Sequence, residues 1–241
     1  MLVKIDNPQT LTKVIEIISE LVTEVRIKVN EYGLSINAID PANVSMVALR
    51  IPKSAFSQFE AGSETIGINL DSLKQILKRC SSASTLILER KDNLLEIQIQ
   101  DRIKRNFTLS LIEIESEEKE FPNLEYSSKV ELTSLDLIAS IEDCAVVADA
   151  CSFQIQEGNF IIEAKGLNSA KSKFSGDEAK IDGENCKSKY SVEYLQKFMK
   201  GAKLCEKTIL QFADDHPMKI DFKAENFSLD FLLAPRVETE D

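Results

Sequence analysis

The sequence predicts an α+β protein made of two similar domains, each with two helices packed on antiparallel sheets. Its 241 residues, 43% of them hydrophobic, are enough for two cores of ordinary size. The order of helical and strand-like segments in the first half returns in the second half, and an acidic stretch separates the halves. We therefore expect one domain at residues 1–112, a connector loop at 113–126 and a second domain at 127–241.

The first half begins with an amphipathic helix. Apolar residues recur at helical spacing over residues 8–22, where Leu11, Val14 and Ile18 form one stripe. Runs with strand-like alternation follow, separated by turn residues. The expected elements after the first helix are strands at 24–30, 34–39 and 65–70, a helix at 71–80, and strands at 85–89, 94–100 and 105–112.

The second half repeats this order. A helical stretch again precedes two strand-like runs, which are separated by a Glu-Gly-Asn turn where the first half has Glu-Tyr-Gly. The repetition of pattern without repetition of sequence indicates a duplicated architecture. The expected elements are a helix at 134–148, strands at 152–156, 160–164, 170–175 and 187–191, a helix ending near 203, and strands at 208–212 and 218–222.

Residues at the expected helix starts support these assignments. Asn7 precedes Pro8, which predicts a capping side chain followed by a proline at the first helical position. Asp71 is a candidate cap for the second helix, and Thr133 with Asp136 forms a variant of the capping box.

The stretch between the halves is acidic and carries Pro122 near its end. Its carboxylates repel one another and the proline disfavours a continuing helix, so we expect an extended connector.

The exposed faces of the four helices differ in charge. The second helix shows Lys74, Lys78 and Arg79, whereas the third shows Asp136, Ser140, Glu142 and Asp143 without a base. The protein has a formal net charge of −11, so any contact with phosphates must use segregated charge. These faces lack aromatic residues for stacking, which favours sequence-independent contact with duplex phosphates. The candidate DNA-binding residues are Lys13, Lys74, Lys78, Arg79, Lys197, Lys200 and Lys203.

The sequence offers little for catalysis. It has one histidine, His216, only eight glycines, and none of the glycine-rich, nucleophile or zinc motifs of common enzymes. Its five cysteines have no metal-ligand spacing, so we expect reduced thiols and neither a metal nor another cofactor. No apolar run is long enough to span a bilayer, and no signal peptide is visible.

Four fragments in sequence order resemble the PCNA family of sliding clamps, and archaeal members in particular. They are Asp40-Pro41 followed by Val44, the Phe121-Pro122 pair in the connector, the Asp215-His216-Pro217 turn, and Ala234-Pro235-Arg236 before an acidic tail. The resemblance spans the whole chain. It implies the DNA-clamp fold and assembly into a ring of six domains, with helices lining a hole for duplex DNA.

The same resemblance implies partners and a partner-binding pocket. The expected partners are a clamp loader and the polymerase, ligase and flap nuclease that dock through PIP-box peptides, with no membrane involved. Such a clamp works in the cytoplasm, on the nucleoid if archaeal, or in the nucleus if eukaryotic. The residues implied for the pocket are Ile39, Asn43, Val44, Met46, Phe121, Pro122, Pro217, Leu232, Ala234 and Pro235.

Some alternatives stay open at this stage. The family often has arginine where this chain has Ala139 and Glu142, so the ring is either a homotrimer with a neutral stretch or a heterotrimer with related subunits. A checkpoint-type clamp is a variant of the second reading. An acidic two-domain hydrolase that uses carboxylate pairs such as Asp214 and Asp215 is the alternative from another class.

Overall fold

The computed structural model describes residues 1–115 and 119–237. The centre of the acidic connector, 116–118, and the end of the acidic tail, 238–241, lie outside the described residues. The chain divides into two compact units. The first consists of Met1–Asn43, Val47–Phe121 and Glu225–Leu229, and the second of Val44–Met46, Pro122–Ala224 and Asp230–Asp241.

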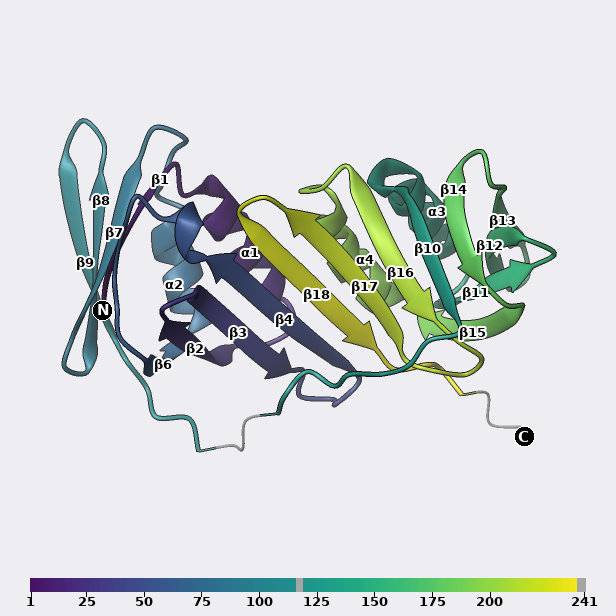
Figure 1. Cartoon of the computed structure of the whole chain (residues 1–241), viewed down its shortest axis with the longest axis horizontal. Coiled ribbons are helices and arrows are strands. Elements are labelled where there is room, and N and C mark those ends of the chain that lie inside the picture. Colours follow the sequence, from purple (N-terminus) through teal and green to yellow (C-terminus); the bar gives the residue numbers. More distant parts are fainter. Residues whose placement is uncertain (116–118, 238–241) are drawn as a thin grey trace. The chain divides into compact units, whose positions relative to one another are not determined.

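The first unit contains the two helices and six strands expected, in the predicted order, together with three strands that were not predicted, β1, β4 and β5. A five-stranded antiparallel sheet runs β5-β1-β7-β8-β9, and β4, β3, β2 and β6 form a second set of neighbours (Figure 1). The bounds are β1 Leu2–Asp6, α1 Gln9–Ile18, β2 Glu24–Asn30, β3 Gly33–Ile39, β4 Ser45–Pro52, β5 Gln58–Glu60, β6 Glu64–Asn69, α2 Leu70–Leu77, β7 Thr85–Lys91, β8 Leu94–Gln100 and β9 Lys104–Ser110, with a short 3-10 helix, η1, at Lys53–Ala55.

The second unit repeats the plan. Its sheets have the orders β13-β12-β11-β15 and β14-β10-β16-β17-β18. The bounds are β10 Ser128–Thr133, α3 Ser134–Val147, β11 Ala150–Gln156, β12 Asn159–Lys165, β13 Ser169–Phe174, β14 Ala179–Gly183, β15 Cys186–Ser191, α4 Val192–Ala202, β16 Lys207–Phe212, β17 Met218–Ala224 and β18 Phe227–Leu233.

Each core lies between helices and sheets. In the first unit α1 buries Val14, Ile15 and Ile18, as its spacing predicted. In the second, α4 buries Phe198, whose ring stacks on Phe231 of β18 at a centroid distance of 4.3 Å. Burial of such rings stabilises a unit by roughly 2–3 kcal/mol each, so the apolar stripes fix which helix faces stay outside.

Two predicted helix caps are wrong. Asn7 has a left-handed backbone with φ 56°, and its amide donates to the carbonyl of Ser84, so its side chain does not cap α1. Strand β6 continues to Asn69, whose side-chain oxygen accepts the amide of Ser72 at 3.0 Å. Asn69 rather than Asp71 therefore caps α2.

The predicted capping box at α3 is only partly formed. The Thr133 hydroxyl donates to the carboxylate of Asp136, but the Thr133 side chain accepts no backbone amide. Ser140, expected on the exposed face of α3, is buried, which corrects that expectation. Its hydroxyl donates to the carbonyl of Asp136 at 2.9 Å. Back-bonding of this kind is common for serine inside helices.

Candidate nucleic-acid interface and partner surface

The outward sides of α1 and α2 carry four of the predicted DNA-binding cations. Lys13 and Arg79 are exposed. Lys78 Nζ lies 3.0 Å from Glu16 Oε1 and links the two helices, while Lys74 Nζ lies 2.6 Å from Asp71 Oδ1 within α2. Ion pairs at the surface contribute at most about 1 kcal/mol, so a phosphate group can displace either carboxylate.

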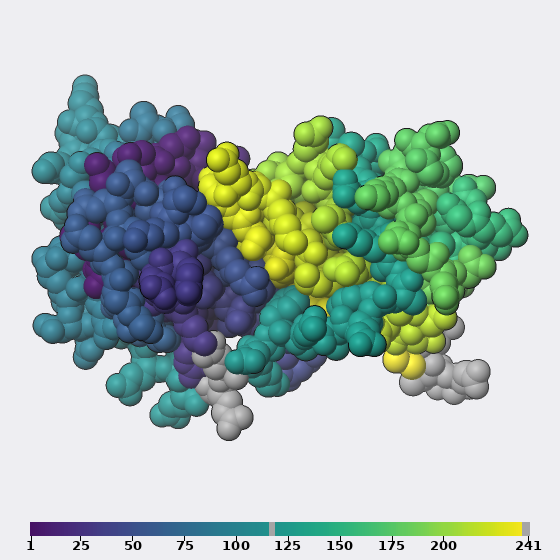
Figure 2. Space-filling view, in the orientation of Figure 1, coloured from purple at the N-terminus to yellow at the C-terminus, as the bar shows by residue number. Residues whose placement is uncertain are grey.

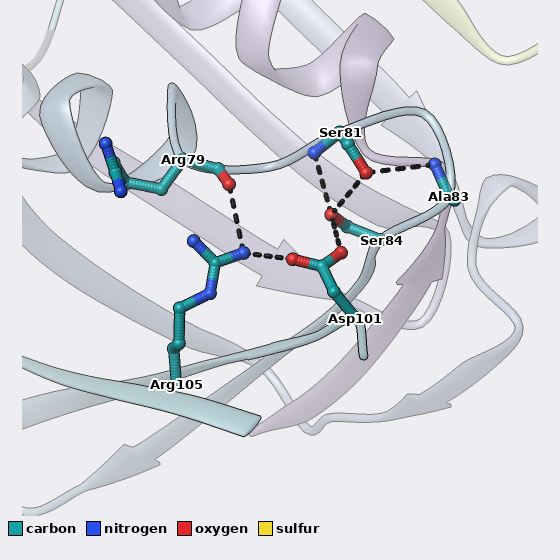
Figure 3. A network of polar contacts seen from close by, with 6 residues as sticks. All are labelled: Arg79, Ser81, Ala83, Ser84, Asp101 and Arg105. Carbon is teal, nitrogen blue, oxygen red and sulfur yellow. Dashed lines mark hydrogen bonds and ion pairs between the residues drawn. The ribbon is translucent and has the colours of Figure 1, made fainter. Parts of the chain in front are cut away.

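A network of polar contacts holds the C-terminal end of α2 to the beginning of β9 (Figure 3). The Arg105 guanidinium donates to the carbonyl of Arg79 at 3.1 Å and also to the carboxylate of Asp101. Asp101 in turn accepts the hydroxyl of Ser84, which accepts the amide of Ser81 at 2.7 Å.

The network leaves the Arg79 side chain pointing away from it, as Figure 3 shows. The hydrogen bond from Ser84 and the contact with Arg105 hold the pKa of Asp101 below its usual value, so the carboxylate stays ionised at neutral pH. The position of Arg79 is thus set through its backbone by Arg105. No local sequence pattern predicts this contact, because Arg105 lies 26 residues further along the chain.

Of the two helices in the second unit, α3 and α4, only α4 has a basic exposed side. Lys200 and Lys203 are exposed, and Lys197 Nζ lies 2.8 Å from Glu193 and 5.2 Å from the centre of the Tyr194 ring. Helix α3 instead exposes Asp136, Glu142 and Asp143 together with two apolar side chains, Leu135 and Val146, which are 76% and 87% exposed.

Three residues predicted for the partner pocket belong to the first unit. Ile39, at the end of β3, and Phe121 are half-buried. Asn43 is exposed and has a left-handed backbone with φ 56°. Its backbone amide donates to the carbonyl of Asp40 at 2.9 Å. Lys119 Nζ lies 3.4 Å from the Asn43 side-chain oxygen.

The other seven belong to the second unit. The structure joins two of them directly, because the amide of Ala234 donates to the carbonyl of Val44 at 2.9 Å. Met46 and Leu232 are almost fully covered, at 9% and 8% exposure. Half-buried apolar surface remains at Val44, Pro122, Pro217, Ala234 and Pro235.

Tyr126 and His216 form a contact that the sequence did not reveal. Their rings meet edge to face with centroids 5.6 Å apart, and the His216 carbonyl accepts the hydroxyl of Tyr190 at 2.7 Å. Burial raises the pKa of Tyr126 to about 12, and so does the nearby Asp221 carboxylate. Figure 2 shows residues 122–126, in teal, lying beside the yellow strands β17 and β18 of the same unit.

Asp221 and Asp230 form a second unexpected pair. They sit on neighbouring strands and are only 4% and 7% exposed. Lys219 Nζ lies 2.8 Å from Asp221, whereas Asp230 Oδ1 is buried without a hydrogen-bond partner. Burial, followed by the charge of Asp221, raises the pKa of Asp230 to about 6. The two residues are nine positions apart in the sequence, and the pairing of β17 with β18 in the sheet brings them together.

Residues 1–115 and 119–237 contain no cluster of three or more metal-ligating side chains. In the same part of the chain, no helix combines the length and the apolar character needed to cross a membrane. Asp214 serves the fold, since its carboxylate accepts the amide of Lys187 at 2.6 Å.

The two similar units, with four helices on antiparallel sheets, define a DNA-clamp protein. Residues 1–120 match the N-terminal domain of proliferating cell nuclear antigen, and residues 120–237 match its C-terminal domain. The chain is 37% identical to the DNA polymerase sliding clamp of Pyrococcus horikoshii and 38% identical to that of Thermococcus gammatolerans, in each case over 97% of both chains.

Solved structures agree on the fold. Proliferating cell nuclear antigen from Thermococcus kodakaraensis superposes with a TM-score of 0.91 at 24% identity, covering 98% of this chain and 99% of that one. The Entamoeba histolytica protein gives 0.90 at 24% identity over 98% of both chains. The chain belongs to the proliferating cell nuclear antigen family and is a DNA sliding clamp, as the four sequence fragments predicted.

Proposed function

We propose that three subunits of this type close into a ring around duplex DNA and hold enzymes on it without performing chemistry themselves. The observation that carries the proposal is that basic and acidic helices each lie beside a free sheet edge. Among the described residues, β9 and β13 each have a strand on one side only. Free edges of this length attract another strand unless something covers them.

The helices beside these edges carry opposite charge. Arg105 ties α2, with Lys78 and Arg79 exposed, to β9, while α3, with Glu142 and Asp143 exposed, packs on β13. If β9 of one subunit pairs with β13 of the next, α2 and α3 of neighbouring subunits come side by side. A head-to-tail contact of this kind generates a closed ring when its rotation allows. Identical chains satisfy this complementarity, so we favour the homotrimer over the heterotrimer.

In this assembly the cations of α1, α2 and α4 contact phosphates without reading bases. Lys13, Lys78 and Lys200 are the central candidates, and α3 supplies no charge to the DNA because its carboxylates belong to the contact between subunits. Enclosure retains the DNA, so the binding itself need not be tight. Partners held by the ring gain from a raised effective concentration near their substrate. The clamp acts on the duplex DNA of the cell and therefore localises to the nucleoid in an archaeal cell.

Retention on DNA tests enclosure. The clamp is loaded by its cognate loader on nicked circular duplex and on linear duplex with free ends, and bound protein is followed after dilution. We expect retention on the circle and rapid loss from the linear DNA. Changing Lys13 and Lys200 to alanine should lower the salt-sensitive part of loading and leave the ring mass unchanged. Equal retention on both DNAs contradicts the proposal.

We also propose that a PIP-box peptide of a polymerase, ligase or flap nuclease docks on the half-buried apolar residues Val44, Pro217, Ala234 and Pro235. Apolar loop surface of this type suits a short helical plug with one or two anchors. The affinity should be roughly micromolar, since the peptide must order itself on binding. Val44→Glu should weaken binding by about tenfold or more, with Leu135→Glu on α3 as the matched control. Unchanged binding moves the peptide site elsewhere.

A further inference from the structure

The outer face of the β13-β12-β11-β15 sheet is basic although the protein is acidic. Its inner face buries Phe153, Phe160 and Tyr190 beneath the helices. The alternate residues point outward, and among the charged ones a single carboxylate, Glu163, stands against five lysines. The lysines of this face, which we name the lysine face, are Lys165, Lys171, Lys173, Lys187 and Lys189.

Strand register arranges four of these lysines regularly. One row across the sheet runs Lys171, Glu163, Ser152, Lys189, and the next runs Lys173, Ile161, Gln154, Lys187. Each row begins and ends with a lysine, and the α-carbons of these two lysines are three strand spacings apart, or about 14 Å. The α-carbons of two lysines on the same strand are two residues apart, or about 7 Å. The four α-carbons therefore mark a rectangle of about 14 by 7 Å.

The carboxylate within the lysine face is already paired. Lys165 Nζ lies 3.0 Å from Glu163 Oε2, and this hydrogen bond holds the pKa of Glu163 below its usual value. A hollow of 730 Å³ opens beside the pair and is lined by Lys165, Lys187, Lys189 and Arg236, with Asp214 and Asp215 also contributing. Because Glu163 is neutralised locally, positive potential dominates the two rows.

The basic excess is not a property of the fold. The outer face of strands β1, β7, β8 and β9 balances three lysines against three carboxylates, and the edge strand β5 adds Glu60 to this face. Lys91 Nζ lies only 2.6 Å from Glu96. The β4-β3-β2-β6 strands, which correspond to the lysine face, carry fewer bases, and Arg26 among them donates to the carbonyl of Ile114. The balanced face consists of Lys4, Lys91 and Lys104 with Asp6, Glu89 and Glu96.

We propose that the lysine face binds the phosphate backbone of a duplex DNA segment outside the ring. Two pairs of lysines about 14 Å apart suit phosphates on either side of a groove of about 12 Å. The face has no aromatic side chain for stacking bases, which disfavours single strands. It also has no exposed apolar anchor, since Ile161 is 5% exposed, which disfavours a peptide.

This inference goes beyond enclosure and does not depend on it, because a lone subunit already has the whole lysine face. Contacts made only to phosphates carry no sequence preference and weaken steeply with salt. The face can therefore hold a neighbouring stretch of duplex loosely and let it slide, while the ring retains the stretch that it encloses.

Covalently closed circular duplex tests the proposal, because without a loader it cannot pass through a closed ring. Binding is measured by co-sedimentation at about 50 mM salt. We expect the wild-type protein to bind and K171E/K173E/K187E to lose at least tenfold in affinity. The matched control, K4E/K91E/K104E on the balanced face, makes the same change in charge and should bind like wild type.

A second variant guards against an indirect effect on β13. K187A/K189A lies on β15, away from the β13 edge, and should lower the slope of log affinity against log salt by about 2. Native mass checks that every variant keeps its assembly. No binding of the closed circle by the wild type overturns the proposal, as does equal loss in the two triple variants. Binding of polyglutamate in place of DNA overturns it in favour of an acidic protein partner. The linear-against-circular retention assay is independent of these outcomes.

Discussion

Helices α2 and α3 each lie beside an edge strand and differ in the charge that they present. The turn that ends α2 exposes Lys78 and Arg79, whereas α3 exposes Glu142 and Asp143. If both helices served DNA alone, the carboxylates of α3 would repel the phosphates that α2 attracts. The difference is consistent with a division of labour, in which α3 meets the basic helix of a neighbouring subunit.

The strongest way to break this comparison is to remove the strand pairing on which it depends. The amide of Leu111 donates to the carbonyl of Asn93 at 2.8 Å, so alternation in an antiparallel ladder turns the Thr108 amide toward the free edge of β9. Thr108→Pro removes that donor with little effect within the subunit, since proline is tolerated on edge strands. We expect light scattering to find monomers at micromolar concentration, and trimers for Thr108→Ala.

The outcome of that experiment also decides between the two assemblies. A wild-type chain that is monomeric under the same conditions contradicts the homotrimer and favours a ring completed by related subunits.

A charge exchange sharpens the comparison directly. E142K/D143K places bases opposite α2 and should weaken each subunit contact by about 2 kcal/mol, or about thirtyfold. K78E/R79E should weaken assembly similarly, and the four changes together should restore it. Sedimentation at low and high salt measures the effect, which high salt should reduce. If the combined variant assembles no better than either pair alone, the two helices do not meet.

Local sequence pattern was sufficient for the four helices, for the charge of each helix and for most of the strands, but it did not predict β1, β4, β5, β10, β14 or β18. The strands at 24–30 and 94–100 match the structure residue for residue, because alternation and turn residues both mark them. The helix caps were less predictable, since a left-handed backbone at Asn7 and an extension of β6 to Asn69 depend on neighbouring segments.

Contacts between distant segments could not be predicted from periodicity. Lys78 with Glu16 and Arg105 with the carbonyl of Arg79 depend on how helices and strands pack, which a single sequence does not specify. The lysine face shows the same limit. Its lysines come from three strands, and only the register reveals that they share one surface.

The smallest expected effect concerns Asp230, a buried carboxylate whose Oδ1 has no hydrogen-bond partner. The folded-state pKa of Asp230 is about 6, against 3.8 for the ordinary side chain, so the folded protein binds this proton more tightly than the unfolded chain does. The stability that the protonated group contributes is therefore present at low pH and is lost as the pH rises from about 4 to about 6.

Asp230→Asn removes the charge and should stabilise the protein by about 1–2 kcal/mol at pH 7.5, a value reduced to allow for solvent screening. The gain should shrink toward zero near pH 4. Denaturant unfolding at both pH values measures it, with Asp214→Ala, which loses the acceptor for the Lys187 amide, as a control expected to destabilise. A gain that is the same at both pH values contradicts this account of the Asp221 and Asp230 pair.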